Sequence, residues 1–433
     1  MSCLLSPGLA RAGNDDELLV GNHAAMLGGA VSATVSDSSA TWYNPAGLGA
    51  VVRDQFDVSA TVYTLRMYDA PKFISTTSGA SEDGSVTEFV VAPTQIAYVR
   101  RLSPGLSLGF GYFVPKASNF VLRERLNDTQ NEPQSQWQIS AAGSNTTHIG
   151  AVGVGVALTP QIRVGGSLIG AYSATTASAT VFGAVSPDGM TLGSNAITSI
   201  ATSSQLSLQL GFGMQLALAP QLLLGLTYRS PEVQLHASLD NSFNRSVTSL
   251  VDLTDPLFGA ESREVKESQG VALMKAGRGG LSVSYVYGPG YVTGEFDVQP
   301  GLRVVKADVD RKAVWNARLG WYHRLSPGVA LGLGLFTDRS GYAKSYDFLD
   351  GTGHFYGGTL GLELNNEHLL APSERVSSLI FNSVFAVRYA FTRGDFGHIV
   401  GDPSLIAENP FLVEKGRILV HELSLYVGGG LHF

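Results

Sequence analysis

The stretch that decides the fold is Gln205-Leu206-Ser207-Leu208-Gln209-Leu210-Gly211-Phe212-Gly213-Met214-Gln215-Leu216-Ala217-Leu218. Leucine, phenylalanine or methionine occupies every even-numbered position of this stretch, and glutamine, serine, glycine or alanine occupies every odd one. A period of two predicts a β-strand with one apolar face. Soluble strands average about 5–6 residues, whereas a tilted strand that crosses a bilayer has about 9–11. The stretch therefore predicts a membrane-crossing strand.

The composition of the whole chain agrees with a membrane barrel. Similar alternation returns in residues 106–114, 331–335 and 381–391. Charged residues make up 15% of the 433 residues, against about 25% in a typical soluble domain. No stretch approaches the roughly 18 consecutive apolar residues of a transmembrane helix. These features exclude a disordered chain and a helical membrane protein, and a transmembrane β-barrel is the first candidate.

The same composition disfavours several functions. The net charge of −7 argues against nucleic-acid binding, which needs a basic face. Cys3 is the only cysteine, so an intrachain disulfide and a multi-cysteine metal site are impossible. The nine histidines include no pair at metal-ligand spacing. The Gly-x-Ser-x-Gly string at Gly105–Gly109 leads into an alternating strand, not into the helix of a nucleophile elbow. We expect no enzyme activity, no metal and no cofactor.

A proline-centred turn recurs along the chain. Its four versions are Leu102-Ser103-Pro104-Gly105-Leu106, Leu158-Thr159-Pro160-Gln161-Ile162, Leu218-Ala219-Pro220-Gln221-Leu222 and Leu325-Ser326-Pro327-Gly328-Val329. Proline fixes φ and cannot join a β-ladder, so each version marks a chain reversal. The prolines are 56, 60 and 107 residues apart. The last gap predicts another turn midway, at Ala276-Gly277-Arg278-Gly279-Gly280.

This spacing predicts an all-β fold, a 14-stranded antiparallel transmembrane β-barrel over residues 53–433. An even number of strands suits a barrel that is closed from hairpins. Long polar loops are expected at 240–261 and 394–414, and the short turns are expected on the opposite rim. The predicted strands are 53–68, 86–102, 105–115, 135–158, 161–180, 203–218, 221–239, 263–276, 279–297, 303–325, 328–341, 354–366, 375–393 and 415–433.

The two ends of the chain carry sorting features. The last strand alternates up to the terminal aromatic Phe433, which resembles the C-terminal signal recognised by the barrel assembly machinery, although an ordinary closing strand would read similarly. Residues 1–12 end in Ala10-Arg11-Ala12, a small-x-small pattern, and we interpret them as a residual signal peptide. A lipobox around Cys3 is the alternative.

Residues 13–52 do not alternate and are rich in small side chains, and they are long enough to fold into the barrel lumen as a hatch. They contain Asp37-Ser38-Ser39-Ala40 and then the string Asn44, Pro45, Ala46, Gly47 and Leu48. On these residues the chain resembles the FadL-type family of long-chain fatty acid and aromatic hydrocarbon transporters. As an isolated pentapeptide, the string would be an ordinary turn.

The resemblance implies a monomeric barrel in the outer membrane of a Gram-negative bacterium. Such a barrel passes fatty acids or related hydrophobic ligands through a lumen that a hatch closes. It also implies a kinked third strand with a lateral exit into the membrane lipid. In this sequence the third strand contains Gly109, Gly111 and Pro115, residues that weaken or interrupt a β-ladder. The alternative is that Pro115 only ends the strand.

Three charged residues are expected to face the lumen, namely Arg318, Arg388 and Glu422. Charge inside a barrel is costly unless it is paired or hydrated. Either arginine could hold a carboxylate head group, but we favour pairing with hatch acids, for which the candidates are Asp15, Asp16 and Glu17. Two other functions stay open: an outer-membrane hydrolase of barrel type and a general porin for polar solutes.

Overall fold

The computed structural model describes residues 18–131, 133–186, 193–249, 257–305, 309–342, 351–368 and 379–433. The predicted leader 1–12 and the predicted hatch acids Asp15, Asp16 and Glu17 lie outside the described residues. Among the described residues, no helix is both long and apolar enough to cross a membrane.

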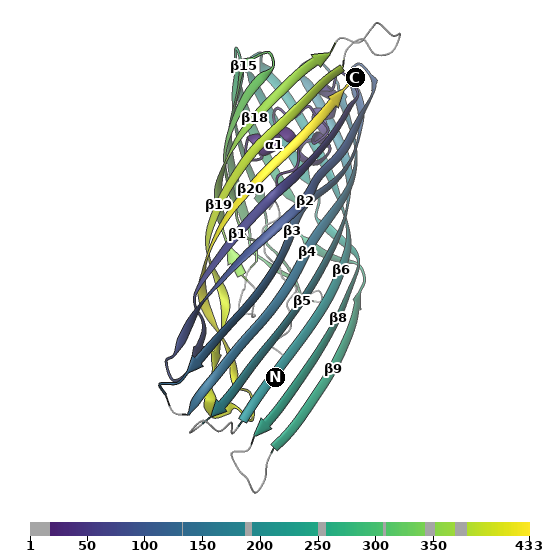
Figure 1. Cartoon of the computed structure of the whole chain (residues 1–433). Helices are drawn as coiled ribbons and strands as arrows, with labels where there is room; N and C mark the ends of the chain where they lie inside the picture. The colour runs from purple at the N-terminus through teal and green to yellow at the C-terminus, as the bar shows by residue number, and fades with distance from the viewer. Residues whose placement is uncertain are drawn as a thin grey trace.

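The described strands close into one antiparallel barrel of 14 strands, as predicted (Figure 1). The first and last strands pair directly, from Gln55↔His432 to Asp69↔Leu419, and this pairing closes the sheet. The barrel strands are β1 (Gln55–Thr76), β2 (Ser81–Ser103), β3 (Leu106–Asp128), β4 (Gln134–Ala157), β5 (Ile162–Ser186), β6 (Gly193–Ala219), β7 (Leu222–Arg229) with β8 (Glu232–Ser249), β9 (Leu257–Gln269) with β10 (Ala272–Lys275) and β11 (Arg278–Tyr287), β12 (Gly290–Gln299), β15 (Val314–Ser326), β16 (Val329–Asp338), β17 (Gly351–Gly353) with β18 (Phe355–His368), β19 (Leu379–Gly401) and β20 (Phe411–His432).

The turn predicted at residues 276–280 is wrong. The chain runs straight through this region, because β10 pairs with β8 and β11 pairs with β7 in one antiparallel direction. The reversal comes later, at Gly288-Pro289, where Tyr287 pairs with Gly290. The predicted strand 303–325 also starts late, at Val314, because the preceding residues form a separate hairpin of β13 (Leu302–Val304) and β14 (Val309–Arg311).

Most strands are longer than predicted at the end away from the proline turns. β3 continues through Pro115 to Asp128, and β8 and β19 take up much of the two predicted long loops. The extensions of β3 (116–128) and β19 (394–401) mix charged, glycine and apolar residues without a clear apolar period of two, so periodicity does not reveal them. At this end of the barrel they contribute to a buried apolar cluster, in which the rings of Trp137 and Phe411 meet edge to face at 5.7 Å.

The outer wall carries an apolar belt. Along β6, Leu206, Leu208, Leu210 and Phe212 are 37–50% exposed, while Ser207 and Gln215 on the opposite face are buried. The stretch with the strongest alternation therefore presents its apolar side chains outward. A polar, small-residue lining inside an apolar exterior is the reverse of a soluble protein and is typical of a membrane barrel.

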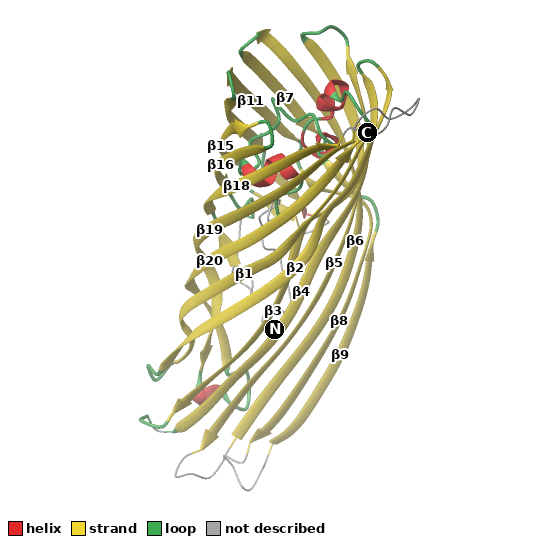
Figure 2. Ribbon diagram, turned by 45° about the horizontal axis from the view of Figure 1, so that its top comes forward, coloured by secondary structure: helices red, strands yellow, loops and turns green. Residues whose placement is uncertain are grey.

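Residues 18–51, which we call the N-terminal segment, lie inside the bore near the end that carries the proline turns and the C-terminus (Figure 2). Their short helices are α1 (Asn22–Met26), α2 (Ala40–Tyr43) and the 3₁₀ helix η1 (Pro45–Ala50). Glycines of the barrel wall let the two backbones approach closely: any side chain at Gly165 would collide with the backbone of Pro45, and one at Gly213 would collide with Asn44.

Candidate functional site

Strand β3 has two very different edges. Its ladder with β4 runs from Leu106↔Val156 to Asp128↔Ser135, almost the full length of both strands. Its ladder with β2 runs only from Ser103↔Leu106 to Gln95↔Phe113. Residues 81–128 are all described, and beyond Phe113 they contain no further pair between the two strands. We call the facing stretches β2 81–94 and β3 114–128 the β2–β3 seam.

Two prolines stand where the seam begins. Pro115 lies in a register shift of the β3–β4 ladder, between Phe113 and Lys116. Pro93 lies beside a shift of the β1–β2 ladder, opposite Ala60. Proline has no N–H to donate, so each removes a ladder hydrogen bond where the two strands would otherwise pair. The two predicted glycines lie before the seam: Gly109 packs against Thr41 of α2, and Gly111 packs against the ring of Phe113.

The N-terminal segment enters the seam. The Leu18 N–H donates to the Pro115 carbonyl at 2.8 Å, which replaces one of the missing strand-to-strand bonds. The Leu18 side chain is 3% exposed and joins an apolar cluster from both sides of the seam, made of Val90, Ala92, Val114 and Ala117. Residue 18 therefore covers the seam with side-chain packing and a single backbone bond.

A buried glutamate and an arginine satisfy other backbone groups along the seam. Glu88 of β2, 1% exposed, accepts the N–H of Asn119 in β3. Arg66 of β1 reaches across β2 to donate to the Ala117 carbonyl at 3.3 Å. A buried backbone group without a partner costs about 1–3 kcal/mol, so these side chains stabilise a wall that lacks its ladder.

Arg66 belongs to a buried ion network that contains two of the predicted lumen charges. Glu422 of β20 lies between Arg66 and Arg388 and forms an ion pair with each. Arg66 also lies 3.5 Å from Glu88, and the Arg388 guanidinium lies 4.6 Å from the centre of the Phe336 ring. The network therefore joins Arg388 and Glu422 to the seam.

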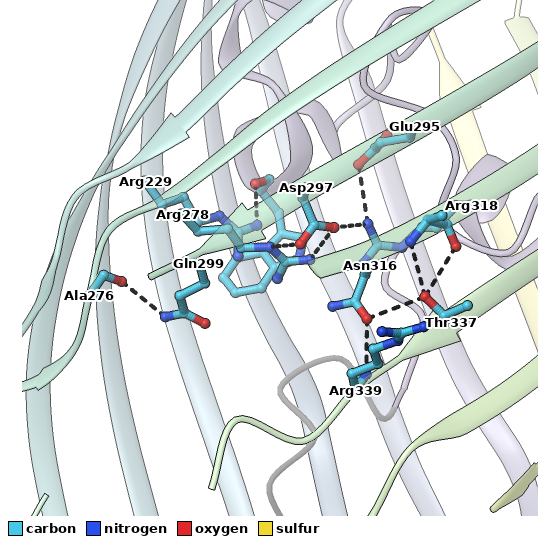
Figure 3. Close-up of polar contacts among 12 residues, drawn as sticks. Arg229, Ala276, Arg278, Glu295, Asp297, Gln299, Asn316, Arg318, Thr337 and Arg339 are labelled. Atoms are coloured by element: carbon cyan, nitrogen blue, oxygen red, sulfur yellow. Dashed lines mark hydrogen bonds and ion pairs between the residues drawn. The ribbon is translucent and has the colours of Figure 1, made fainter. Parts of the chain in front are cut away.

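The third predicted charge, Arg318, lies in a separate network (Figure 3). Its guanidinium lies 2.6 Å from Asp297 and 3.4 Å from Glu295, both on the neighbouring strand β12. Asp297 also binds Arg278 through two 2.8 Å bonds, and Glu295 accepts the N–H of Ser32 at 3.1 Å. Within the described residues, the acids that pair with Arg318 and Arg388 are therefore barrel acids, and the N-terminal segment is held through one of them.

Asn44 fixes the fold of the N-terminal segment. Its amide donates to the Ser32 carbonyl at 2.7 Å and to the Met214 carbonyl of β6 at 3.3 Å, and its side-chain oxygen accepts the N–H of Ala46. Pro45 is the first residue of η1, where its fixed φ suits a helix and no N–H is missed. Gly47 packs against the Val35 backbone. The string thus connects the segment to itself and to the wall.

His23 forms a second attachment, on α1. Its Nε2 lies 3.5 Å from Glu363 of β18, and its Nδ1 lies 3.9 Å from Asp37. Burial lowers the pKa of His23, but the hydrogen bond and charge of Glu363, with Asp37, outweigh burial and raise it to about 9. At neutral pH the imidazole is therefore protonated and pairs with barrel and segment acids.

A cavity of about 100 Å³ is bounded by Trp42 of the N-terminal segment and by Pro115 of β3. Apolar side chains on its lining include Trp42, Ile149, Ile169 and Leu208, and its basic side chains include Lys116, Arg229 and Lys275. The Arg229 guanidinium lies 3.8 Å from the centre of the Trp42 ring and donates to the Trp42 carbonyl at 2.7 Å. The sequence analysis did not predict a role for Trp42 or Arg229. The alternation of the strand around exposed Tyr228 indicates that Arg229 points inward. No sequence pattern indicates that Arg229 contacts Trp42.

The geometry defines a class: a closed 14-stranded antiparallel barrel with its N-terminal segment in the bore and one partly unpaired wall. Within the described residues, no group of His, Cys, Asp or Glu side chains is arranged to hold a metal ion. No protein-family model matches the amino-acid sequence, and neither does any curated protein sequence.

Comparison of this chain with solved structures identifies its fold. A FadL homologue from Pseudomonas aeruginosa is 9% identical, with 95% of this chain and 98% of that chain covered and a TM-score of 0.58. The Pseudomonas putida toluene transporter TodX is 12% identical over 96% and 99%, with a TM-score of 0.61. The Ralstonia pickettii toluene transporter TbuX is 11% identical over 95% and 98%, with a TM-score of 0.51. The chain has the FadL-type fold.

Proposed function

We propose that this protein carries long-chain fatty acids or related hydrophobic compounds across the outer membrane of a Gram-negative bacterium by passive diffusion. The observation that carries the proposal is the β2–β3 seam, covered by Leu18, in a barrel with an apolar belt. The fold shared with a FadL homologue and with toluene transporters supports the same function. The toluene transporters among those neighbours favour a protein that is not an enzyme.

In this proposal residues 13–52 form the hatch and residues 53–433 form the barrel. The rim with the proline turns faces the periplasm, because short turns lie on that side of outer-membrane barrels. Asn44, Pro45, Ala46 and Gly47 hold the hatch against the wall. The terminal Phe433, whose N–H donates to the Asp54 carbonyl at 3.0 Å, directs the chain to the barrel assembly machinery, and the barrel acts as a monomer.

A lateral path suits an apolar cargo. An acyl chain gains about 0.8 kcal/mol for each methylene that leaves water, so a hydrated axial pore would be a barrier to it. The seam leads from the cavity beside Pro115 toward the lipid without such a pore. The cavity, about 100 Å³, is smaller than the roughly 300–1,000 Å³ of a ligand pocket. Leu18 and its neighbours must therefore move before a fatty acid passes.

The basic groups have separate roles in this proposal. Arg318 and Arg388 are engaged by barrel acids, so they hold the wall and seat the hatch instead of binding a head group. Lys116 and Arg229 line the cavity beside the path, so a carboxylate inside the cavity would lie next to them. Gly109 lets α2 pack closely, Gly111 makes room for Phe113, and Pro115 interrupts the ladder that would otherwise close the exit.

A double substitution tests the hatch. Asn44→Ala with Pro45→Ala removes the bonds to Ser32 and Met214, and we expect fatty acid uptake to fall while the barrel still assembles. Uptake is measured with a labelled fatty acid in cells that lack their own transporter. The matched control is Asn409→Ala with Pro410→Ala, the same dipeptide at the far end of the barrel. Normal uptake in the Asn44 variant would contradict the role.

The alternatives give different results. A general porin shows steady open conductance in planar bilayers, whereas the apolar cluster at one end and the N-terminal segment at the other predict none. A barrel hydrolase releases fatty acid from an ester lipid, whereas this proposal predicts no release by the purified protein. Either positive result would overturn the transport proposal.

A further inference from the structure

A second pocket, of about 600 Å³, is lined by residues of β1, β19 and β20 and by residues that flank β15, β16 and β17. Its lining includes Arg393 of β19, Arg417 of β20 and Lys312, which immediately precedes β15. Along β19 the residues alternate, so that Tyr389, Phe391 and Arg393 are exposed while the residues between them are buried. Arg393 and Arg417 therefore face away from the lumen.

The pocket lies directly beyond the apolar belt. Phe391 pairs with Tyr356 and with His421 of the neighbouring strands, so the three rings form one row across this wall. Two residues further along β19 is Arg393, and two further is Asp395, which pairs with Arg417 in the ladder. Aromatic rings mark the membrane interface, so the basic residues stand at the height of the lipid headgroups.

The local charge is positive. Asp395 also lines the pocket, and it is engaged by Lys415 at 2.7 Å. For Lys312, Arg393 and Arg417 the structure records no ion pair within the described part of the chain. Ser340, Tyr342, Leu419 and Pro71 also line the pocket. Guanidinium, ammonium and hydroxyl donors around one hollow suit the oxygens of a phosphate.

We propose that this pocket binds the phosphorylated headgroup of a lipid in the leaflet at the long-strand end of the barrel. The acyl chains of that lipid would lie along the exposed side chains of the belt below, which include Phe391, Leu423 and Met67. The inference rests on the proposed outer-membrane location. The headgroup is a phosphate monoester on a sugar, as in lipid A, because three basic side chains in the lining suit a dianion.

The test uses the full-length protein purified in neutral detergent and native mass spectrometry. The probes are diphosphoryl lipid A, monophosphoryl lipid A and inorganic phosphate. The variant is Lys312→Ala with Arg393→Ala and Arg417→Ala. The control is Arg123→Ala with Arg263→Ala and Lys266→Ala, which removes the same charge from exposed positions on β3 and β9. Far-ultraviolet circular dichroism checks that both variants keep the barrel.

We expect the wild type and the control to hold diphosphoryl lipid A equally well. The pocket variant should bind it about 100-fold more weakly, because each basic residue beside an anionic lipid surface contributes about 1 kcal/mol, close to a fivefold change in affinity. Equal binding by the pocket variant and the control would overturn the site. Inorganic phosphate that competes at equal concentration would show a free-anion site and would overturn the lipid assignment.

Transport separates this inference from the proposed function. The pocket variant should take up fatty acids as the wild type does, because its residues lie on the outer wall, away from the seam. Loss of lipid A binding with normal uptake supports both proposals. Normal lipid A binding by the variant together with normal uptake overturns only the lipid site.

Discussion

The two edges of β3 belong to the same residues, but the edge toward β4 is paired along its length and the edge toward β2 is paired over only part of it. Toward β4, the backbone pairs from Leu106 to Asp128 without a gap other than the shift at Pro115. Toward β2, pairing stops at Phe113, and the remaining wall is held by Leu18, Glu88 and Arg66. A ladder locks a wall through many cooperative bonds, whereas a few side chains can be released one at a time. A closed barrel can therefore open more easily at the β2–β3 seam than at the β3–β4 ladder.

The largest expected effect comes from the ion network beside the seam. Glu422→Ala leaves Arg66 and Arg388 without their shared acid, and removal of one partner from a buried ion pair costs about 3–5 kcal/mol. We expect a clearly lower midpoint of thermal unfolding in detergent, followed by circular dichroism. Glu414→Ala, an exposed position on the same strand, is the control. An unchanged midpoint for Glu422→Ala would contradict the support that this network gives to the seam.

The next effect concerns the cover of the seam. Leu18→Ala keeps the backbone bond to Pro115 but removes the side chain from the apolar cluster. We expect uptake of labelled fatty acid to rise several-fold, because the path is less obstructed. Leu19→Ala is the control, since Leu19 is equally apolar but packs in a different cluster with α1. Equal uptake in both variants would show that residue 18 does not limit passage.

The smallest expected effect is a pH dependence at His23, the second attachment of the N-terminal segment to the barrel wall. The pKa of His23 is raised from 6.5 to about 9, so its stabilisation is complete below pH 6.5 and is lost as the pH rises through 9. Chymotrypsin cleavage at Trp42 and Tyr43 of the N-terminal segment, normalised to the activity of the protease at each pH, should therefore speed up between pH 8 and 10 in the wild type. In His23→Gln the cleavage rate should not change over this range. A rate that is equally pH-dependent in both proteins would rule out His23 as the group responsible.

Much of the fold could be predicted from the sequence, and the reason is physical. Gln205–Leu218 alternates because one face meets lipid and the other meets the lumen, so the period of two survives throughout the belt. Beyond the belt both faces of a strand meet water or a packed core, so alternation fades and the sequence predicts strand ends that fall short of the observed ones. The glycines at 277 and 279–280 suggested a turn, but a glycine-rich stretch also fits a strand that passes close to neighbouring side chains such as Tyr228.

The site was less predictable. The sequence indicates Pro115, because it is a proline within a predicted strand. It also indicates Arg388, because it occupies an inward position of an alternating strand. Their partners come from distant strands: Leu18 from the N-terminal segment, and Arg66 and Glu422 from the first and last strands. Such contacts depend on the closure of the barrel, which no local pattern encodes. The missed pair of Trp42 and Arg229 has the same origin.

A cleavable cross-link across the seam tests the central claim most directly. In a Cys3→Ser background, Ala92→Cys with Ala117→Cys places thiols on the two sides of the seam, within one apolar cluster. Val121→Cys with Ala142→Cys places them across the paired β3–β4 edge, as direct ladder partners. A short disulfide-containing bismaleimide is applied, and uptake of labelled fatty acid is measured before and after reduction. We predict that the seam cross-link abolishes uptake reversibly while the ladder cross-link has no effect; undiminished uptake through a cross-linked seam would contradict lateral passage.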